Sequence, residues 1–350
     1  MGETREVSSA AKLAFLRRPE SFPDEPSEVE IIETHFAWVF LSRRFVYKLK
    51  KPIRFHVIDF TTVSARRANC ELEIVLNRRL AEAVYIGVVP LARDAGGGLA
   101  LEGGGEVVDW LVKMHRLPRA RMLDHAAPAG RVSARERRAL VNKLVRFYRR
   151  AVRPRWSPAQ YLARLDRALQ SYGDQLESPE LGLDSSRIER LVAKQRRYLQ
   201  RDADALAARI AHGRVVDAHG DLRPEHVYLS EEPQIIDCLE FSTDLRWLDS
   251  AEEICFLALE CQRLGQAALA DELSALYREQ AGDPVPPTLW AFYRSQRASI
   301  RALLCAWHLQ DEHRRWLERA EWYLDVAESS IAEAAGGFSR PVGAASSRDS

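Results

Sequence analysis

Alternating apolar and polar residues near the start of the chain predict two β-strands, over residues 35–42 (HFAWVFLS) and 45–50 (FVYKLK). Only Arg43 and Arg44 separate the two runs, which predicts a β-hairpin, and Pro52 closes the second strand. Two further strands are predicted over residues 85–94 (YIGVVPLARD) and 106–114 (EVVDWLVKM), joined by a glycine-rich turn. The first third of the chain is therefore expected to be rich in β-structure.

One long helix is predicted within this β-rich region, over residues 61–83. A Thr- and Ser-rich opening precedes apolar residues at helical spacing, and this apolar stripe is formed by Leu72, Val75, Leu76 and Leu80. Ahead of the first strand, residues 10–18 predict a short helix, followed by a Pro- and acid-rich connector over residues 21–30. The predicted order is strand, strand, helix, strand, strand.

The remainder of the chain shows mainly helical periodicity, from residue 133 to about residue 211 and again from residue 250 to about residue 335. Two short β-like runs interrupt it, within VVDAHGDLRPEHVYL (215–229) and QIIDCLEF (234–241). A Gly- and Ser-rich tail over residues 336–350 is expected to be disordered. The chain contains no internal repeat.

Composition narrows the class of protein. With 51 basic and 50 acidic residues among 350, the net charge is +1, so no overall field favours nucleic acid or an anionic membrane. Five scattered cysteines, none in a CxxC pair, indicate reduced thiols rather than disulfides or zinc. The polar N-terminus lacks a signal-peptide pattern and no apolar run could span a bilayer, so we expect a cytoplasmic protein without a membrane partner.

Two acidic residues carry the first chemical signal. Asp221 follows one short apolar run, and Asp237 ends another, sixteen positions further along the chain. Phosphoryl transfer requires one carboxylate to accept the hydroxyl proton and another to hold the metal ion that neutralises the phosphates. The competing interpretation is structural: Asp221 could cap a turn and Asp237 could simply end a strand.

A family resemblance makes the signal more specific. His219-Gly220-Asp221, followed by Ile236-Asp237, resembles the catalytic loop and metal motif of aminoglycoside phosphotransferases and choline kinases. The resemblance covers roughly residues 30–330. It implies a two-lobed, protein-kinase-like α+β fold, with a small, mainly antiparallel N-lobe and a larger helical C-lobe. It also implies that Asp221 is the catalytic base and that Asp237 binds Mg²⁺.

This resemblance implies a division of the chain. Residues 1–30 would form an N-terminal extension, residues 31–116 the ATP-binding N-lobe, residues 117–335 the helical C-lobe, and residues 336–350 a disordered tail. The segments ETHFAWVFL, VYKLKKP, RRANCELE, HGDLRPEH and IDCLEF resemble a bacterial subgroup that is often fused to a P-loop ATPase. No P-loop motif occurs in this sequence, so a P-loop ATPase is expected as a separate partner. In the family, the residue matching Asp249 braces the catalytic loop.

A kinase-like N-lobe needs a strand lysine for the ATP phosphates and a helix glutamate that positions it. Lys48 is the predicted lysine, and Lys50, on the same face of the strand, is the alternative. Glu73 matches the family's helix glutamate, whereas Glu71 lies on a different face of the helix. Each of these residues could instead belong to a solvated, charged surface.

The segment after the fourth strand corresponds to the family's inter-lobe hinge, whose backbone contacts adenine. This places Met114 and Arg116, within residues 114–117, among the predicted ATP-binding residues. No side chain identifies a hinge, and a plain strand end is the competing interpretation.

His226 departs from the family pattern, because it stands where the family has a metal-binding asparagine. Imidazole suits Mn²⁺ better than Mg²⁺, so His226 could select a softer metal or could leave one metal position empty. Glu240, three residues after Asp237, is the preferred source of a replacement oxygen ligand, and Glu225 is the other candidate. There is also no glycine-rich loop in the first hairpin, as in the small-molecule branch of the family.

The function predicted from the sequence is transfer of a phosphoryl group from ATP, with Mg²⁺ or Mn²⁺, to the hydroxyl of a small molecule. The alternatives are a nucleotide-binding pseudokinase or regulatory module, which His226 makes credible, and a kinase-fold enzyme that transfers a nucleotidyl group. The sequence identifies neither the acceptor nor the oligomeric state. Mixed charge along the C-terminal helices argues against a polycationic aminoglycoside as the acceptor.

Overall fold

The computed structural model describes residues 7–55, 58–307 and 313–336. They form two compact units. Unit 1 consists of the described residues up to 151 together with residues 219–247 and 264–266. Unit 2 consists of residues 152–218 and 248–263 and the described residues from 267 onward. The predicted tail beyond residue 336 lies outside the described residues. The predicted lobe boundary at residue 116 stays a prediction.

Unit 1 is built on a six-stranded antiparallel sheet with the order β1-β2-β3-β8-β6-β7. Its strands are β1 (Glu30–Glu33), β2 (Ala37–Leu41), β3 (Phe45–Lys50), β6 (Tyr85–Arg93), β7 (Leu99–Leu101) and β8 (Glu106–His115), and a separate pair comprises β4 (Arg54–Phe55) and β5 (Ile58–Asp59). The predicted hairpin and both later strands are confirmed. The short strands β1 and β7 extend the sheet at its edges and were not predicted from the sequence.

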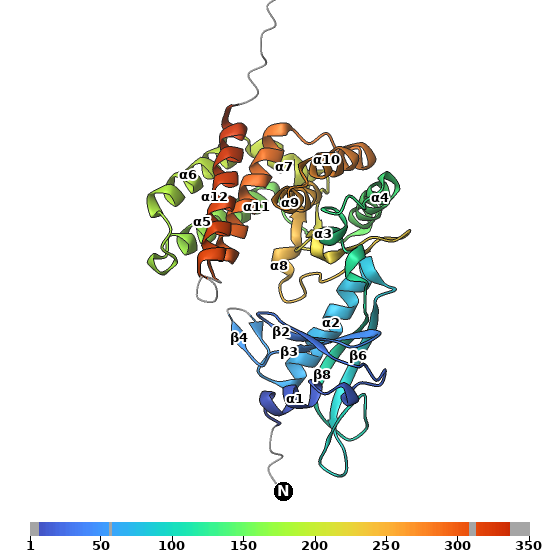
Figure 1. Ribbon diagram of the computed structural model, residues 1–350. Helices are drawn as coiled ribbons and strands as arrows, with labels where there is room; N and C mark the ends of the chain where they lie inside the picture. The colour runs from blue at the N-terminus through green and yellow to red at the C-terminus, as the bar shows by residue number, and fades with distance from the viewer. Residues whose placement is uncertain (1–6, 56–57, 308–312, 337–350) are drawn as a thin grey trace, which may run out of the picture. The chain divides into compact units, whose positions relative to one another are not determined.

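Helix α2 (Val63–Ala81) packs on this sheet against β6 and β8 (Figure 1). The helix begins where predicted, with the Thr62 hydroxyl accepting a hydrogen bond from the backbone N–H of Ala65. Its buried face differs from the predicted one. Leu76 and Leu80 are buried, but Leu72 and Val75 are 41% and 65% exposed, because the inward stripe also carries polar residues of the candidate site.

The N-terminal segment is part of unit 1. Helix α1 (Ser9–Leu16) is the predicted short helix, and Leu16 and Phe22 lie in the same apolar cluster as residues of β2 and β3. Lys12 is buried and lies 2.7 Å from Asp109 of β8. Arg66 of α2 binds both oxygens of Asp109, at 2.8 and 2.9 Å. One buried carboxylate thus links helix α1, helix α2 and the sheet.

The remaining elements of unit 1 include those of the segment that contains the two acidic motifs. It comprises α3 (Leu123–Ala126), α4 (Ala134–Arg150), the antiparallel pair β10 (Val227–Tyr228) and β11 (Gln234–Ile235), α8 (Thr243–Arg246), and the 3-10 turns Pro19–Ser21, Arg119–Arg121 and Pro224–His226. The two β-like runs predicted from the sequence are therefore present as short strands.

Unit 2 is mainly helical, as predicted. Its helices are α5 (Pro158–Leu176), α6 (Ser185–Arg201), α7 (Ala203–Ala211), α9 (Ser250–Arg263), α10 (Ala267–Ala281), α11 (Pro287–Ala306) and α12 (His313–Gly336), accompanied by the 3-10 turn Pro179–Leu181 and by β9 (Val215–Asp217), which pairs with β12 (Trp247–Asp249). Helix α11 packs along α12 and α9, and α5 packs against α6 (Figure 1).

One buried arginine of unit 2 is paired with two carboxylates. Arg209 binds both Asp249 and Asp283, and the hydroxyl of Tyr293 donates to Asp249 at 2.9 Å.

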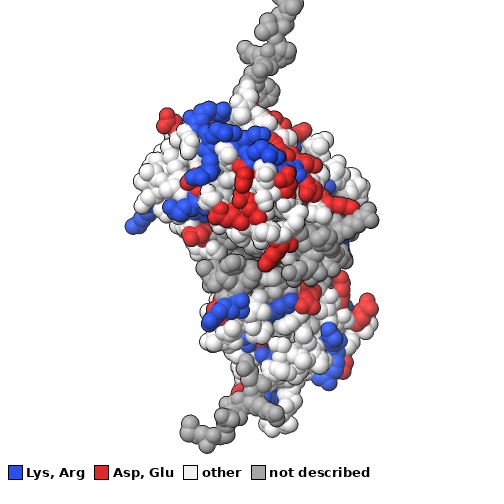
Figure 2. Space-filling model, turned by 90° about the vertical axis from the view of Figure 1, so that its left-hand side faces the viewer, with Lys and Arg blue, Asp and Glu red and all other residues white. Residues whose placement is uncertain are grey.

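On the face in Figure 2, Lys and Arg side chains gather in a band with Asp and Glu side chains beside it. Among the described helices, none combines the length and the apolar character that crossing a membrane requires.

Candidate active site

The HGD segment is shaped by His219, whose side chain is fully buried. Its Nε2 lies 2.8 Å from the carbonyl oxygen of Ile236, which can only accept, so Nε2 carries the proton. Its Nδ1 then accepts from the backbone N–H of Asp221 at 3.3 Å. Burial, helped by the nearby His226, lowers the pKa of His219 to about 4. A neutral imidazole of defined tautomer thus joins the Asp221 loop to the Asp237 loop.

Gly220 is required by both conformation and packing. Its φ of +90° lies in the left-handed region, where a side chain would be strained. A Cβ at this position would also come within 2.9 Å of Leu239 Cδ1 and 3.2 Å of Arg246 Cγ. The backbone therefore passes close to residues 239–246, and this approach fixes the start of the Asp221 loop.

The carboxylate of Asp221 is held by Arg223 and is 22% exposed. Arg223 Nε lies 3.0 Å from Asp221 Oδ1, and its Nη1 lies 2.7 Å from Glu225 Oε1. A cation beside a carboxylate favours the ionised form, and only an ionised carboxylate can take up a proton. The loop thus presents a partly accessible proton acceptor in a fixed position.

His226 connects the two aspartates. Its Nδ1–H donates to the backbone carbonyl of Asp221 at 2.8 Å. This bond directs the other ring nitrogen, Nε2, toward Asp237, and the distance from Nε2 to Asp237 Oδ2 is 3.5 Å. Arg223 Nη2 donates a hydrogen bond to the same Nε2 at 3.2 Å. Histidines that bind metals commonly donate their second N–H to a carbonyl in this way. This geometry leaves Nε2, which faces Asp237, as the ring nitrogen of His226 suited to binding a metal ion.

Four successive backbone N–H groups of the Asp237 loop are hydrogen-bonded. Ile236 donates to His226 O, Asp237 to the Tyr85 hydroxyl, Cys238 to Asn77 Oδ1, and Leu239 to His219 O, at 2.9, 3.1, 2.9 and 3.1 Å. Asp237 itself has a φ of +62°, an unusual conformation for a residue other than glycine. These bonds hold the loop in a conformation that an isolated turn would rarely adopt.

Lys48 joins this loop to helix α2. Its ammonium lies 2.7 Å from Asp237 Oδ1 and 3.0 Å from Glu73 Oε1. Burial alone would lower the pKa of Lys48, but Asp237 and Glu73 outweigh it and hold that pKa well above its usual value. Burial likewise opposes ionisation of Asp237, yet Lys48 and His226 keep the pKa of this carboxyl far below its ordinary range. Lys48, Glu73 and Asp237 are therefore all charged.

Lys50 extends the same arrangement into the interior. Its ammonium binds Glu73 Oε2 and Glu240 Oε1, and all three side chains are buried. Asp237, Lys48, Glu73, Lys50 and Glu240 thus form a continuous series of ion pairs, which we call the lysine–carboxylate chain. Both of its ends come from the loop that contains Asp237, and its centre comes from β3 and α2.

The structure brings most of the predicted site residues together. Glu73 is the glutamate that reaches Lys48, whereas Glu71 pairs with Arg67 at the surface. Glu240 binds Lys50, and within the described parts of the chain no three His, Cys, Asp or Glu side chains gather as a metal site. The assignment of Glu240 as a metal ligand stays a prediction.

Neither of the two predicted hinge residues is a member of the lysine–carboxylate chain. Met114 packs in an apolar cluster with Cys70, Ile74 and Val112. Arg116 donates to the Ser42 carbonyl at 2.8 Å and lies 3.0 Å from Glu30. Their assignment to adenine binding stays a prediction.

Sequence reasoning missed the residues that support the two loops. Besides accepting from the backbone N–H of Cys238, Asn77 donates to the carbonyl of Glu73 at 2.9 Å. An asparagine inside a helix, one turn after Glu73, is a sequence feature that could have indicated such a role. Tyr85 and Arg223 had no such signal. Their contacts depend on how strands and loops that are distant in the sequence meet.

Comparison with solved structures identifies the fold of this chain. A choline kinase from Cryptosporidium parvum superposes with a TM-score of 0.53 at 10% identity, covering 93% of this chain and 96% of that one. A choline/ethanolamine kinase family protein from Mesorhizobium loti gives 0.50 at 14% identity, covering 93% and 99%. The GDP complex of a mutant aminoglycoside 2'-phosphotransferase-IIIa gives 0.51 at 13%, covering 93% and 99%. The chain has the fold of these kinases.

This kinase-like fold confirms the two-part α+β architecture expected from the sequence. Among curated proteins, uncharacterized proteins of Mycobacterium tuberculosis strain H37Rv and of Mycobacterium bovis are each 32% identical over 288 residues. The match covers 80% of this chain, which spans only 55% of the relatives' length. No protein-family model matches the sequence.

Proposed function

We propose that this chain is a phosphotransferase that moves the terminal phosphoryl group of ATP to the hydroxyl of a small molecule. The proposal rests on the position of Lys48. Its ammonium nitrogen lies 3.0 Å from a carboxylate oxygen of Glu73 and 2.7 Å from one of Asp237. Kinases position the phosphate-binding lysine with a helix glutamate and place a metal-binding aspartate beside it. The fold shared with choline and aminoglycoside kinases supports the same reaction class.

Asp237 and His226 fit the requirements for holding a divalent metal ion that arrives with the nucleotide. The Asp237 side chain is 45% exposed, and His226 Nε2 lies 3.5 Å from its Oδ2. One or two protein carboxylates usually suffice for Mg²⁺, because phosphates and water supply the other ligands. When bound, the metal would neutralise phosphate charge. Lys48 would hold the α- and β-phosphates by charge and hydrogen bonds.

Asp221 would accept the proton of the acceptor hydroxyl. In this step a bond forms between the acceptor oxygen and the terminal phosphorus, the bond from that phosphorus to ADP breaks, and the hydroxyl proton moves to Asp221. Arg223 and the His219–Gly220 backbone would fix the carboxylate while it does so. Positioning and charge stabilisation account for most of the catalysis in this reaction class.

The proposal is tested by adding ATP and Mg²⁺ to the purified chain and measuring thermal stability, then ADP release with sugars, nucleosides, amino alcohols and aminoglycosides as acceptors. We expect ATP to raise the unfolding temperature, and at least one acceptor class to stimulate ADP release. If ATP fails to stabilise the chain, with or without divalent metals, the proposal is wrong.

His226 favours one other function, a nucleotide-binding module without turnover, because it occupies the position of the family's metal-binding asparagine. Stabilisation by ATP together with no ADP release for any acceptor would support that alternative. The P-loop ATPase partner stays a prediction.

We expect Mn²⁺ to support turnover at least as well as Mg²⁺, and His226→Asn to shift the preference back toward Mg²⁺. The reason is that His226 Nε2 lies beside Asp237, and an imidazole nitrogen suits Mn²⁺ better than the harder Mg²⁺. The measurement is initial rate against metal concentration for both variants. His212→Asn, at an exposed helix end in unit 2, is the matched control. An unchanged ratio of Mn²⁺ to Mg²⁺ rates in His226→Asn would remove any metal-selecting role.

A further inference from the structure

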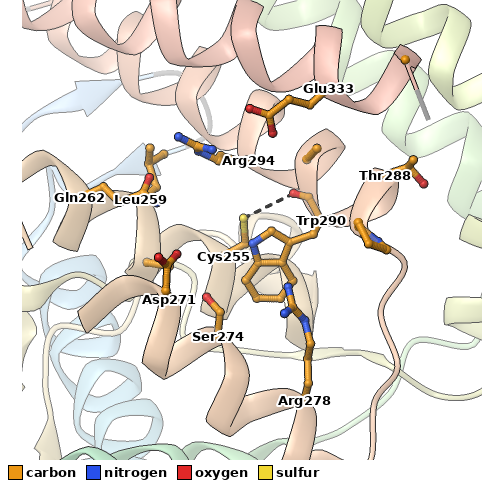
Figure 3. A pocket seen from close by; sticks show the side chains of 14 residues that line it. Cys255, Leu259, Gln262, Asp271, Ser274, Arg278, Thr288, Trp290, Arg294 and Glu333 are labelled. Atoms are coloured by element: carbon orange, nitrogen blue, oxygen red, sulfur yellow. Dashed lines mark hydrogen bonds between the residues drawn. The ribbon is translucent and has the colours of Figure 1, made fainter. Parts of the chain in front are cut away.

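A second candidate site lies in unit 2, where α9, α10, α11 and α12 enclose a pocket of about 710 Å³ (Figure 3). This volume falls within the range of small-molecule sites. Figure 3 shows the indole of Trp290 among the side chains that line the pocket. The backbone carbonyl of Trp290 accepts a hydrogen bond from Cys255 Sγ at 3.6 Å. No residue of the proposed phosphotransfer site contributes to the lining.

Four charged side chains line this pocket: Asp271, Arg278, Arg294 and Glu333. In the described parts of the chain none of them forms an ion pair, although two arginines and two acids share one pocket. Arg278 instead lies over the Trp290 ring, 4.7 Å from its centroid. The pocket thus presents separate positive and negative groups that do not neutralise one another.

Two polar atoms of the lining are shielded from water without a hydrogen-bond partner among the described residues. They are Arg294 Nε, a donor, and Gln262 Oε1, an acceptor. Buried polar atoms normally have hydrogen-bond partners, so an unpaired one requires an explanation, such as strain or a functional role. Arg294 and Gln262 therefore keep unused hydrogen-bonding capacity in the wall of the pocket.

We propose that this pocket binds a small zwitterion of the amino-acid type, with its carboxylate at Arg294, its ammonium group toward Gln262 and the two acids, and an apolar side chain against Trp290. Opposite charges on separate helices favour a molecule that carries both charges over one that carries a single charge. The half-buried indole of Trp290 in the lining favours an apolar or aromatic body. The proposal does not depend on phosphotransfer.

The test uses three probes with the same carbon skeleton between ring and charge: L-phenylalanine, 3-phenylpropanoate and phenethylamine. They carry both charges, the negative charge only and the positive charge only. Binding to the full chain is measured by calorimetry without nucleotide, and L-leucine and L-methionine are included to vary the side chain. We expect at least one of the amino acids to bind, and L-phenylalanine to bind about tenfold or more tightly than either singly charged analogue.

Arg294→Met should weaken amino-acid binding about tenfold or more, because the carboxylate loses its cation, whereas Arg294→Lys should retain part of the affinity. Arg190→Met is the matched control, since Arg190 is an exposed arginine of α6 outside the pocket. Thermal unfolding of each variant shows whether it is folded. The proposal is overturned if no amino acid binds, if the three phenyl probes bind equally, or if folded Arg294→Met binds as tightly as the unmodified chain.

Discussion

Asp221→Asn is expected to lower turnover by a factor on the order of 10² to 10⁴ while leaving stabilisation by ATP unchanged. Asparagine has nearly the same shape as aspartate, but its amide cannot take up the hydroxyl proton. The loop should keep its conformation, because His219 and Gly220 determine its path and Arg223 can still donate to the amide oxygen. Steady-state ADP release and thermal shifts with ATP measure the two effects separately.

The matched control for this variant is Asp244→Asn, since Asp244 is an exposed aspartate in the same unit. It should retain both turnover and stabilisation by ATP. Full turnover in Asp221→Asn would mean that another group accepts the proton. Loss of nucleotide binding in the same variant would mean that Asp221 holds the nucleotide rather than serving as a base.

Lys50→Ala is expected to reduce the free energy of unfolding by about 3–5 kcal/mol, because it leaves Glu240 without its cation in a buried position. Lys48→Ala should reduce stability much less and turnover much more. Its partner Asp237 is partly exposed, and Glu73 keeps Lys50 as a counterion. Urea unfolding and ADP release, measured on both variants, separate the structural lysine from the phosphate-binding one.

Lys51→Ala provides the comparison for this pair of lysines, because Lys51 follows them directly and pairs with Glu33, whose side chain is 65% exposed. Its loss should cost no more than about 1 kcal/mol. If Lys50→Ala retained full stability but lost turnover, the roles of the two lysines would be exchanged. The lysine–carboxylate chain would then be part of the nucleotide site along its whole length.

The fold was largely predictable because its signals are local. Period-two alternation located β2 and β3, helical spacing located α2, and the HGD and Ile-Asp motifs pointed to the two loops of the site. The orientation of α2 was harder to predict. Its inner stripe includes Glu73 and Asn77, and a pattern that counts only apolar residues assigns such positions to solvent.

The partners within the site were less predictable than the elements that carry them. Glu240 was expected at a metal because it lies three residues after Asp237, yet it binds Lys50, which is 190 positions away in sequence. Likewise, the hydroxyl of Tyr85 accepts from the backbone of Asp237, 152 positions away. Contacts of this kind depend on the packing of the sheet, helix α2 and the loops, which spacing along the sequence does not encode.

The close approach at Gly220 bears on how active and inactive members of such a fold can be told apart. The start of the loop is fixed by the bare backbone of Gly220 and by the neutral ring of His219, through contacts that do not involve the carboxylate of Asp221. A descendant that had lost its chemistry could therefore keep the His-Gly pair for structural reasons alone. Retention of those two residues would show only that the loop still folds, and the acid that follows them would be the informative position.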